Sequence, residues 1–444
     1  MADAIKSGDP TLSNKSFYFK SVLLTSDRLP NKEFDLAPVT VELEIFENIT
    51  MPYLTGNIVF IDSRGVLAGV DIIGGEKIAV SIQSTKPETF PVEKTFYVKS
   101  VNNAKRVNNS NEIVSLSLIE DIVFISALYN ISKSYTGTCG DIISKISDSY
   151  LKRNIAQVGD DYQRKFKVII PNLAPIGSMQ WIKRKATNEL GFPFYLFSTL
   201  VGDDLVFTDL ASLMDQNAMN TVAFGTDQAQ AGTGSSIVAQ RRTVYGYDYS
   251  NNDDLYSLIT AGMVGSKHVS IDTMTGVPKE FNFDVNADAL QKYKSSLTTK
   301  NLRTLPFDPA FTYNDASLNT YQSRTIAQVM SSGAYMTESY DKGLSYNQED
   351  TVEGYKRKII SESMWNFLLK TVSYWIINGV DFIDGRYNTS IGRVIAVNVP
   401  FNTDGDIKTD PKQSGDHLII ACRHMFKSDG YYISMSGAKL GSVK

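Results

Sequence analysis

Histidines are the scarcest reactive side chains in this sequence, with only His268, His417 and His424 present. His417 and His424 lie seven residues apart in a segment, HLIIACRHMF, whose composition is typical of a strand. An odd spacing on a strand places two side chains on opposite faces, so this pair is not expected to share a ligand. No HExxH, CxxC or EF-hand spacing occurs. We expect no metal site and no cofactor, and we interpret His424 as a packed or hydrogen-bonded strand residue.

Motifs for nucleophilic or phosphate chemistry are also missing from the sequence. There is no GxSxG arrangement, no SxxK together with its partner motifs and no Walker A pattern, and Gly232-Thr-Gly234 is too short for a dinucleotide loop. Cys139 and Cys422 are too few for a disulfide framework and are interpreted as ordinary buried thiols. The adjacent carboxylates near turns favour solvated loops over catalysis, so no catalytic residue is expected; these pairs are Glu120-Asp121, Asp203-Asp204 and Asp253-Asp254.

Two aromatic runs, Phe17-Tyr18-Phe19 and Tyr245-Gly-Tyr247-Asp-Tyr249, have side chains that can stack on bases. Their setting is not basic, because 44 Lys and Arg face 48 Asp and Glu, and the net charge is −4. A protein that grips nucleic acid by its phosphates needs a concentrated basic face. The composition therefore argues against specific nucleic-acid binding and favours core or subunit-interface roles for these aromatics.

The elements that must position these side chains belong to a long globular chain of 444 residues and 49.2 kDa. Apolar residues make up 42%, which excludes wholesale disorder, and the length suggests about two to four domains. The start, Met1 to Lys6, lacks the pattern of a secretory signal, and no apolar run approaches the roughly 18 residues of a membrane span. We expect no membrane insertion and folding in the cytoplasm.

Alternating patterns predict strands in the first ~125 residues. Leu43 and Ile45 alternate with Glu42 and Glu44, and similar alternation follows at 78–82 and 114–118. Gly74-Gly75 and Asn108-Asn109 mark turns between the runs. Several short strands separated by turns are typical of a small sandwich or barrel.

The middle of the chain changes to a helical period. Thr138, with Asp141 three residues later, predicts the start of a helix over 139–150, and a second helix is expected from Met179 to Leu190, ended by Gly191. Residues 130–225 thus predict an α/β unit, and 226–240 read as a linker. A polar, turn-rich stretch follows at 286–350, then a helix near 350–369 and a strand at 371–377, whose Asn378-Gly379 predicts a hairpin.

An internal repeat links the two ends of the chain. Three segment pairs recur in the same order at nearly constant offsets of 317, 319 and 322 residues. They are Gly75–Ile82 with Gly392–Val399 (392 − 75), Val114–Ser117 with Ile433–Ser436 (433 − 114), and Phe60–Asp62 with Phe382–Asp384 (382 − 60). The repeat predicts two related β-domains near the ends of the chain.

This layout resembles the baseplate hub proteins of contractile-tailed bacteriophages and the related hub part of secretion-system spike proteins. The segments that carry the resemblance are short. They are Gly74-Gly75-Glu76, Pro171–Pro175 before Trp181-Ile182, Asn378-Gly379, Gly392, Pro400, Ser414-Gly415, Leu418–Ile420 and His424. The resemblance covers about residues 35–430, while 286–350 match nothing in it.

The resemblance implies a mainly β, α+β protein with two similar antiparallel β-barrel domains, an α/β insert and a helical or irregular elaboration between them. The first barrel is expected at 1–129, and the second at 241–285 together with 371–444. The insert and linker are expected at 130–240, and the elaboration at 286–370. It also implies a homotrimer whose six barrels join a sixfold tail tube to a threefold spike. DNA is expected to pass through the lumen of this ring, and a slightly acidic protein does not bind its phosphates tightly.

The implied partners are a separate spike protein, the tail tube or its initiator, other baseplate proteins and the tape-measure protein, in a virion tail assembled in the host cytoplasm. The spike is expected to be separate because the chain ends soon after Ser436. On this interpretation the chain is not an enzyme. Two alternatives stay open: a phage-associated cell-wall or polysaccharide hydrolase, and the detached hub module of a secretion-system spike.

Overall fold

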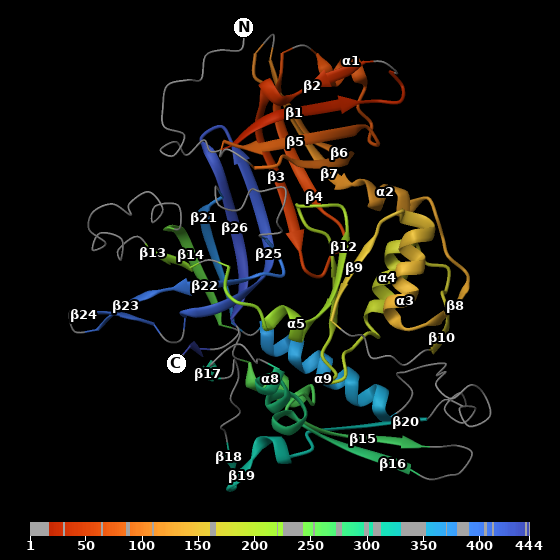
Figure 1. Cartoon of the computed structure of the whole chain (residues 1–444), viewed down its shortest axis with the longest axis vertical. Helices are drawn as coiled ribbons and strands as arrows, with labels where there is room; N and C mark the ends of the chain where they lie inside the picture. Colours follow the sequence, from red (N-terminus) through yellow and green to blue (C-terminus); the bar gives the residue numbers. More distant parts are fainter. Residues whose placement is uncertain are drawn as a thin grey trace.

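Strands dominate the computed structural model of the chain, so the expected mainly β fold is confirmed (Figure 1). Thirteen of the described strands belong to one large sheet. The structure describes residues 17–29, 32–63, 65–85, 89–108, 111–159, 166–219, 221–224, 243–251, 254–271, 278–296, 302–304, 312–329, 352–369, 371–379, 390–403, 406–410, 413–439 and 442–443.

Seven strands from the first 120 residues form one half of the large sheet, in the order β2-β1-β5-β6-β7-β4-β3, and every pairing is antiparallel. Apolar positions of each strand face a common core, as with Ile78 and Val80 on β5. Among the described pairings of this half, the two end strands of the series, β2 and β3, do not pair with each other, so the series is open. The strands are β1 (Phe17–Thr25), β2 (Glu33–Asp35), β3 (Thr40–Asn48), β4 (Thr55–Asp62), β5 (Lys77–Ser84), β6 (Val92–Arg106) and β7 (Glu112–Glu120).

Six later strands form the second half, and their pairings run in a closed circuit, β25-β22-β13-β14-β21-β26 and back to β25. The expectation of purely antiparallel barrels needs correction here, because short β13 pairs in parallel with both β14 and β22. These strands are β13 (Thr221–Phe224), β14 (Thr243–Asn251), β21 (Thr371–Asn378), β22 (Val394–Asn398), β25 (Gly415–Lys427) and β26 (Gly430–Lys439).

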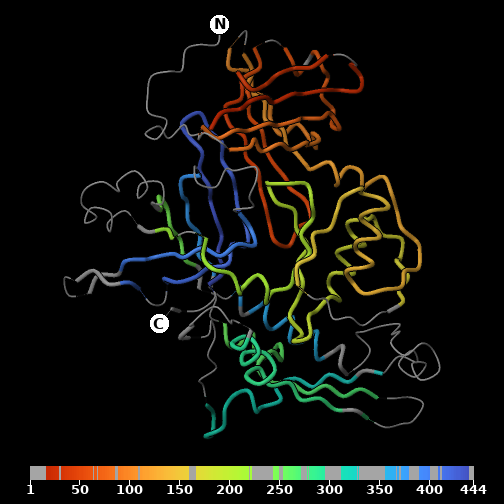
Figure 2. Tube along the Cα trace, viewed as in Figure 1, coloured from red at the N-terminus to blue at the C-terminus, as the bar shows by residue number. Residues whose placement is uncertain are grey.

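Strand β25 joins the two halves into one continuous sheet (Figure 2). One of its edges pairs with β26 along most of its length. The other edge pairs with β22 through 415–418 and then with β3 of the first half through 421–427. A bulge at Ile420 separates these two stretches, and a bulge bends a strand locally, which suits a strand shared by two curved units.

The predicted duplication is confirmed by the order of strands in the sheet. The series β5-β6-β7-β4-β3 in the first half has the same chain order and the same antiparallel neighbours as β22-β25-β26-β21-β14 in the second. The matched segments Gly75–Ile82 and Gly392–Val399 contribute β5 and β22, and Val114–Ser117 and Ile433–Ser436 lie in β7 and β26. Each half therefore repeats one five-strand unit.

The registers agree as far as Val101 of β6, after which a further bulge between Val101 and Asn103 has no counterpart in β25. The bulge between Val98 and Ser100 on β6 falls where the bulge between Ile419 and Ala421 falls on β25, an offset of 321 (419 − 98). A second bulge, in β3 opposite Phe60, recurs in β14 opposite Ile377. This register equates Phe60 with Ile377, at an offset of 317. The sequence match of Phe60–Asp62 to Phe382–Asp384 is therefore wrong by five residues. Residues 382–384 themselves lie outside the described residues.

The insert between the halves is an α/β unit with its own apolar core. Its first long helix begins with the predicted capping box, in which Thr138 and Asp141 exchange hydrogen bonds. The second helix is shorter than predicted, because it ends at Lys183 and a turn built around Asn188 replaces the expected helical turn before Gly191. Its elements are α2 (Asp121–Ala127), β8 (Ser134–Gly137), α3 (Cys139–Ile146), β9 (Ile155–Val158), β10 (Phe166–Ile169), α4 (Pro175–Lys183), β11 (Phe194–Phe197), β12 (Leu205–Asp209) and α5 (Leu210–Met214).

An elaboration is inserted between β14 and β21 of the second half. Residues 265–284, expected in the second β-domain, instead form a separate three-stranded sheet in which β15 pairs with β16 and β20. Val285, Leu290 and Tyr293 are buried beside α9, so the start of the polar stretch is packed. The elements here are α7 (Leu255–Thr260), β15 (Gly265–Ile271), β16 (Pro278–Asp284), α8 (Gln291–Ser296), β17 (Leu302–Thr304), β18 (Thr312–Tyr313), β19 (Ala316–Ser317), β20 (Arg324–Val329) and α9 (Val352–Leu369).

The predicted hairpin at Asn378-Gly379 is wrong. β21 pairs with β14 and β26 and has no pairing with β22, the next described strand of the chain. A side chain on Gly379 would collide with the ring of Tyr431, since an ideal Cβ there lies 2.3 Å from ring carbons. The glycine is thus a point of close approach to β26. The remaining short elements are α1 (Val66–Val70), β23 (Pro400–Thr403), β24 (Asp406–Thr409) and β27 (Ser442–Val443).

Candidate functional site: the polar joint between the two halves

A buried pair of polar side chains lies where β3 of the first half meets β25 of the second. Nε2 of His424 lies 2.8 Å from Oε2 of Glu47, and both side chains are almost fully buried. Glu47 continues the inward face of β3 after Leu43 and Ile45. His424 sits on the inward face of β25, opposite Ile45 in the ladder. The pair therefore connects the two halves side chain to side chain beneath the strand ladder.

Three further groups complete the network around this pair. The Ser390 hydroxyl donates to Oε1 of Glu47 at 3.0 Å, and the backbone N–H of Leu200 donates to the same oxygen. The hydroxyl of Tyr431 lies 2.8 Å from Nδ1 of His424, at the far side of the ring. Buried polar groups of this kind are stable only when their partners are present. Because Leu200 belongs to the insert, the network ties all three units together.

Cys422 lies beside this network and shares its burial. Its sulfur, a Glu47 oxygen and a His424 nitrogen lie within 4.8 Å of one another. Burial, reinforced by the Glu47 carboxylate, holds the pKa of the Cys422 thiol well above its usual value, and the same two causes raise the pKa of Tyr431. Both imidazole nitrogens of His424 are already in hydrogen bonds. The arrangement thus holds the two halves together, and the Cys422 thiol beside it is protonated and is therefore a poor nucleophile.

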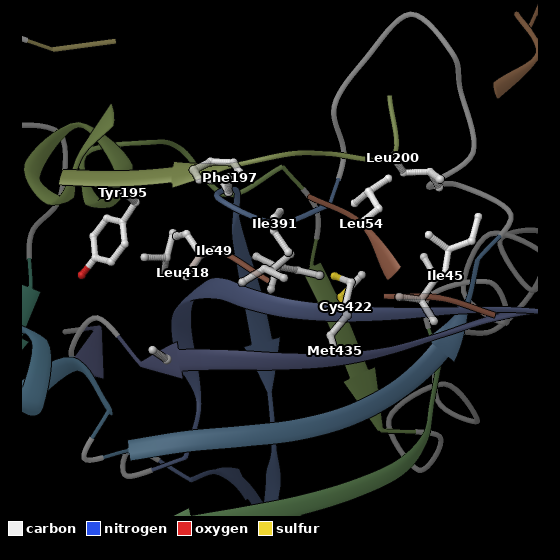
Figure 3. Close-up of a cluster of buried hydrophobic side chains, with 14 of the residues drawn as sticks. Ile45, Ile49, Leu54, Tyr195, Phe197, Leu200, Ile391, Leu418, Cys422 and Met435 are labelled. Carbon is white, nitrogen blue, oxygen red and sulfur yellow. The ribbon is translucent and has the colours of Figure 1, made fainter. Parts of the chain in front are cut away.

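Apolar side chains from all three units enclose the joint (Figure 3). They come from β3, the loop before β4, β11 and the segment after it, the segment before β22, and β25 and β26. Those labelled in the figure are Ile45, Ile49, Leu54, Tyr195, Phe197, Leu200, Ile391, Leu418, Cys422 and Met435. The Glu47 and His424 side chains are almost fully buried within this enclosure, so their polar atoms depend on the hydrogen-bond partners named above.

The opposite face of the same joint carries a ladder of ion pairs. Lys427 Nζ lies 3.1 Å from Glu42 Oε1, and the Arg423 guanidinium binds the Glu44 carboxylate. The Arg423 guanidinium also lies over the ring of Phe46, 5.7 Å from its centre. Each acid is on β3 and each base is on β25. The two strands are therefore connected by ion pairs on the solvent face of the joint and by hydrogen bonds on its buried face.

His417 lies on the same face of β25 as His424, contrary to the sequence expectation. The bulge at Ile420 adds one residue, so that His417 is opposite Lys439 and His424 opposite Ile433, six residues apart on β26. His417 packs against Trp375 and its Nδ1 lies 2.9 Å from the Gly415 carbonyl. Burial, with a smaller contribution from Lys439, lowers its pKa to about 4. It is a neutral core residue at neutral pH.

A second buried polar joint fixes the insert to the first half. Oε2 of Glu120 accepts a hydrogen bond of 2.7 Å from the Leu54 N–H, and Lys94 Nζ lies 3.8 Å from the other carboxylate oxygen. Lys94 also donates to the Gly202 carbonyl and lies 3.3 Å from Asp203. Burial raises the pKa of Glu120, and the charge of Lys94 partly offsets this rise.

The residues singled out from sequence take mostly structural positions. Glu120 is buried, whereas the carboxylate of its neighbour Asp121 binds Arg153 at 2.7 Å. Asp254 caps α7, whereas Asp253 and Gly232-Thr-Gly234 lie outside the described residues. Phe17 and Phe19 pack against Phe426, which confirms their expected core role. His268 and Cys139 are buried in β15 and α3, respectively.

Sequence reasoning did not identify Glu47 or Lys94 as important. The available signal was their position, because each is a charged residue in register with the apolar face of a strand: Glu47 follows Leu43 and Ile45, and Lys94 precedes Phe96 and Val98. A charge on an inward face must be paired when the strand is buried. Its partner is remote in sequence and appears only in the fold.

Comparisons with known proteins place the fold. No protein-family model matches the chain, and no curated protein sequence matches it. Among solved structures, a tail protein from Neisseria meningitidis MC58 is similar over 95% of this chain and 97% of its own, with a TM-score of 0.51 and 12% identity. The 43 kDa tail protein of prophage MuSo2 from Shewanella oneidensis is similar over 94% of this chain and 98% of its own, with a TM-score of 0.52 and 11% identity. The chain thus has the fold of these tail proteins along nearly its whole length.

Within the described part of the chain, no helix is both long enough and apolar enough to span a membrane. The longest described helix, α9, has 18 residues and carries several charged side chains.

Proposed function

We propose that this chain is a structural hub of a contractile phage tail, in which three copies form a ring of six quasi-equivalent β-units. The observation that carries the proposal is the duplicated five-strand unit with matching registers and bulges. A threefold object that contacts a sixfold one must present the same kind of surface twice per chain. The fold shared with two tail proteins supports this role.

The polar joint supplies the rigidity that such a ring requires. Two units that must hold a fixed rotation to each other need a joint that does not hinge. Here a continuous ladder, β3 with β25, is reinforced on one side by the Glu47–His424 network and on the other by ion pairs to Glu42 and Glu44. Domain pairs with polar, loosely packed contacts move by default, so this construction favours one geometry.

The solvent face of the continuous sheet is proposed to line the lumen. On that face several strands carry small neutral polar residues beside exposed apolar ones such as Ile61 and Ile113, and the charges at the joint are paired; the polar residues are Asn57, Ser115, Ser117, Ser434 and Ser436. A wall without excess positive charge forms few counterion-releasing contacts with phosphates, so DNA passes without being held. The overall charge of −4 agrees with such a wall.

The proposal includes the implied partners and excludes catalysis. Tube, spike and other baseplate proteins would contact the two rims of the ring, and the tape-measure protein would pass through it, in a virion tail assembled in the host cytoplasm. We keep the four regions expected from the sequence, which are the two β-units, the insert and the elaboration. The proposed elaboration of the second β-unit is now 252–370. The most buried carboxylates, Glu47 and Glu120, each accept backbone N–H groups, which is a structural use of an acid. Turnover of cell-wall glycan that is lost on changing one carboxylate would contradict this part.

Assembly is tested by multi-angle light scattering of the purified chain across a concentration series. Three copies of 49.2 kDa give about 148 kDa, and we expect that mass at high concentration. A constant mass near that of one chain, with the spike protein present as well as absent, would contradict the proposed function.

A further inference from the structure

Charge is unevenly distributed along this chain, and the insert carries an excess of bases. Residues 131–190 contain ten Lys and Arg against five Asp and Glu, a net charge of +5 (10 − 5). The whole chain carries −4, so the remaining residues together carry −9 (−4 − 5). Separation of charge between parts of one molecule is typical of a surface that attracts a partner of opposite sign. The insert is thus the basic part of a chain that is acidic elsewhere.

Three of these lysines border the two-stranded sheet that β8 and β10 form at the margin of the insert (Figure 1). Lys167 is directly opposite Thr136 in this sheet, and Nζ of Lys145 on α3 lies 3.2 Å from the Thr136 carbonyl oxygen. Lys133 precedes β8, and its Nζ lies 5.6 Å from the centre of the Tyr135 ring. All three lysines are exposed, and none forms an ion pair with an acid in the described part of the chain. Their charges are therefore available to a partner.

Exposed apolar side chains lie close to these lysines. Ile169 points outward from β10 between two buried neighbours and is 68% exposed. Tyr129 is 46% exposed, and its ring packs edge-on against Tyr150 at 5.7 Å. Tyr150 hydrogen-bonds in turn to Tyr135, whose ring lies beneath Lys133. Exposed aliphatic and aromatic side chains among bases are typical of a protein–protein interface, in which such residues are enriched.

The insert lies on the side of the large sheet that faces away from the proposed lumen. The Leu200 N–H of the insert donates to Glu47, whose side chain is on the buried face of β3. Glu42 and Glu44 are on the opposite face of β3, which is the face proposed to line the lumen. The sheet therefore separates the lysines of the insert from DNA in the lumen, and these bases are directed to the surroundings of the ring.

We propose that the basic face of the insert, made by Lys133, Lys145, Lys167 and Ile169, binds an acidic protein surface outside the ring. The exposed isoleucine fits a protein partner, because the phosphates that dominate contacts with nucleic acid give it nothing to pack against. Three lysines on one small sheet also fall short of the concentrated basic face that holds nucleic acid. The inference rests on the proposed hub function, and it gives the chemistry of one partner, an acid-rich protein of the surrounding tail.

The test is fluorescence anisotropy of labelled polyanions titrated with the full-length chain. The probes are poly-L-glutamate and a random copolymer of glutamate and tyrosine, which represent an acidic protein surface without and with apolar side chains. We expect both to bind at low ionic strength and the copolymer to bind more tightly. K133E/K145E/K167E should weaken the binding of both by about tenfold or more, because three attractive charge contacts become repulsive. Ile169→Ser should weaken the binding of the copolymer alone.

The matched control is K77E/K99E/K105E. These lysines are exposed on β5 and β6 of the first half, so the control makes the same change of net charge away from the insert. It should weaken binding by less than about twofold once salt screens long-range attraction. Circular dichroism spectra and thermal midpoints of both triple variants should match those of the native chain, since all six side chains are on the surface.

An equal loss of binding in the two triple variants would overturn the assigned face, and so would binding that K133E/K145E/K167E leaves unchanged. Tighter binding of duplex DNA or of anionic lipid vesicles than of the copolymer, at one ionic strength, would overturn the protein partner. Light scattering separates these results from the hub itself, because K133E/K145E/K167E should keep the trimer mass. A trimer that binds neither polymer would overturn this inference and leave the hub intact. A chain that binds through the insert but stays monomeric at every concentration, with the spike present, would overturn the hub.

Discussion

Glu47 is the residue on which the joint between the halves depends. Its carboxylate accepts from His424, Ser390 and the Leu200 N–H within a fully buried pocket. We expect Glu47→Ala to lower the free energy of unfolding by about 3–5 kcal/mol, because the partners left behind are buried without an acceptor. Urea denaturation followed by tryptophan fluorescence measures this loss.

Glu42 provides the matched control on the same strand. It pairs with Lys427 at the surface, with about a quarter of its side chain exposed. Exposed pairs contribute about 0–1 kcal/mol, so Glu42→Ala should change stability little. Equal losses for the two variants would show that the buried network has no special role in the joint.

His417 should make the stability of the protein sensitive to acid. Its pKa is about 4 in the folded chain because of burial, against 6.5 when unfolded. A histidine with a depressed folded pKa binds more protons when unfolded, so its contribution is full above pH 6.5 and declines as the pH falls toward 4. The loss between these limits is about 3 kcal/mol. Unfolding free energies measured from pH 7 to 4.5 report it.

The duplication supplies the control variant for this pH effect. Phe96 occupies on β6 the position that His417 occupies on β25, at the offset of 321 (417 − 96), and it is fully buried. His417→Phe should therefore fold, and its stability should fall less between pH 7 and 4.5 than that of the native chain. Parallel pH profiles for the two proteins would assign the acid sensitivity to other groups.

At the scale of elements, equivalent strands should respond alike to the same change. Val80 on β5 and Val397 on β22 occupy matching inward positions and are almost fully buried. Val80→Asp and Val397→Asp should each cost several kcal/mol, since each buries an unpaired charge. Ala79→Asp, on the exposed face of β5, should cost less than about 0.5 kcal/mol. A tolerated Val397→Asp would contradict the assigned equivalence of the strands.

We predict that two parts of the polar elaboration exchange their amide hydrogens at different rates. Val285, Leu290 and Tyr293 are buried, so amides near them should exchange slowly in the isolated chain. The stretch 312–329 is largely exposed, and we expect it to exchange rapidly alone and to become protected in an assembled particle. Hydrogen exchange by mass spectrometry compares the two states, and equal protection in both would remove this segment from the docking surfaces.

Element type and the repeat could be predicted from sequence, because both depend on local patterns. Alternation identified the strands, and Thr138 with Asp141 identified the start of α3. Features decided by a remote contact could not be. The bulge at Ile420 reversed the relation of His417 to His424, and the turn around Asn188 ended α4 early. The partner of Glu47 is 377 residues away, so no local pattern reveals it.

At the scale of the whole molecule, one chain is a third of the proposed ring. Within the chain the two β-units meet through β3 and β25. In the proposed ring, three such joints lie within chains and three further joints lie between chains. This explains why a long chain devotes its best-matched polar and apolar contacts to one internal joint.

The most direct test of that claim is electron cryo-microscopy of the purified full-length chain, alone and with its spike protein. We expect threefold particles around a central channel, with six β-units per ring that superpose by their five common strands. The units should alternate between the β3–β25 joint and a joint between chains. A monomer in both samples, or an assembly in which the two halves make unrelated contacts, would contradict the account.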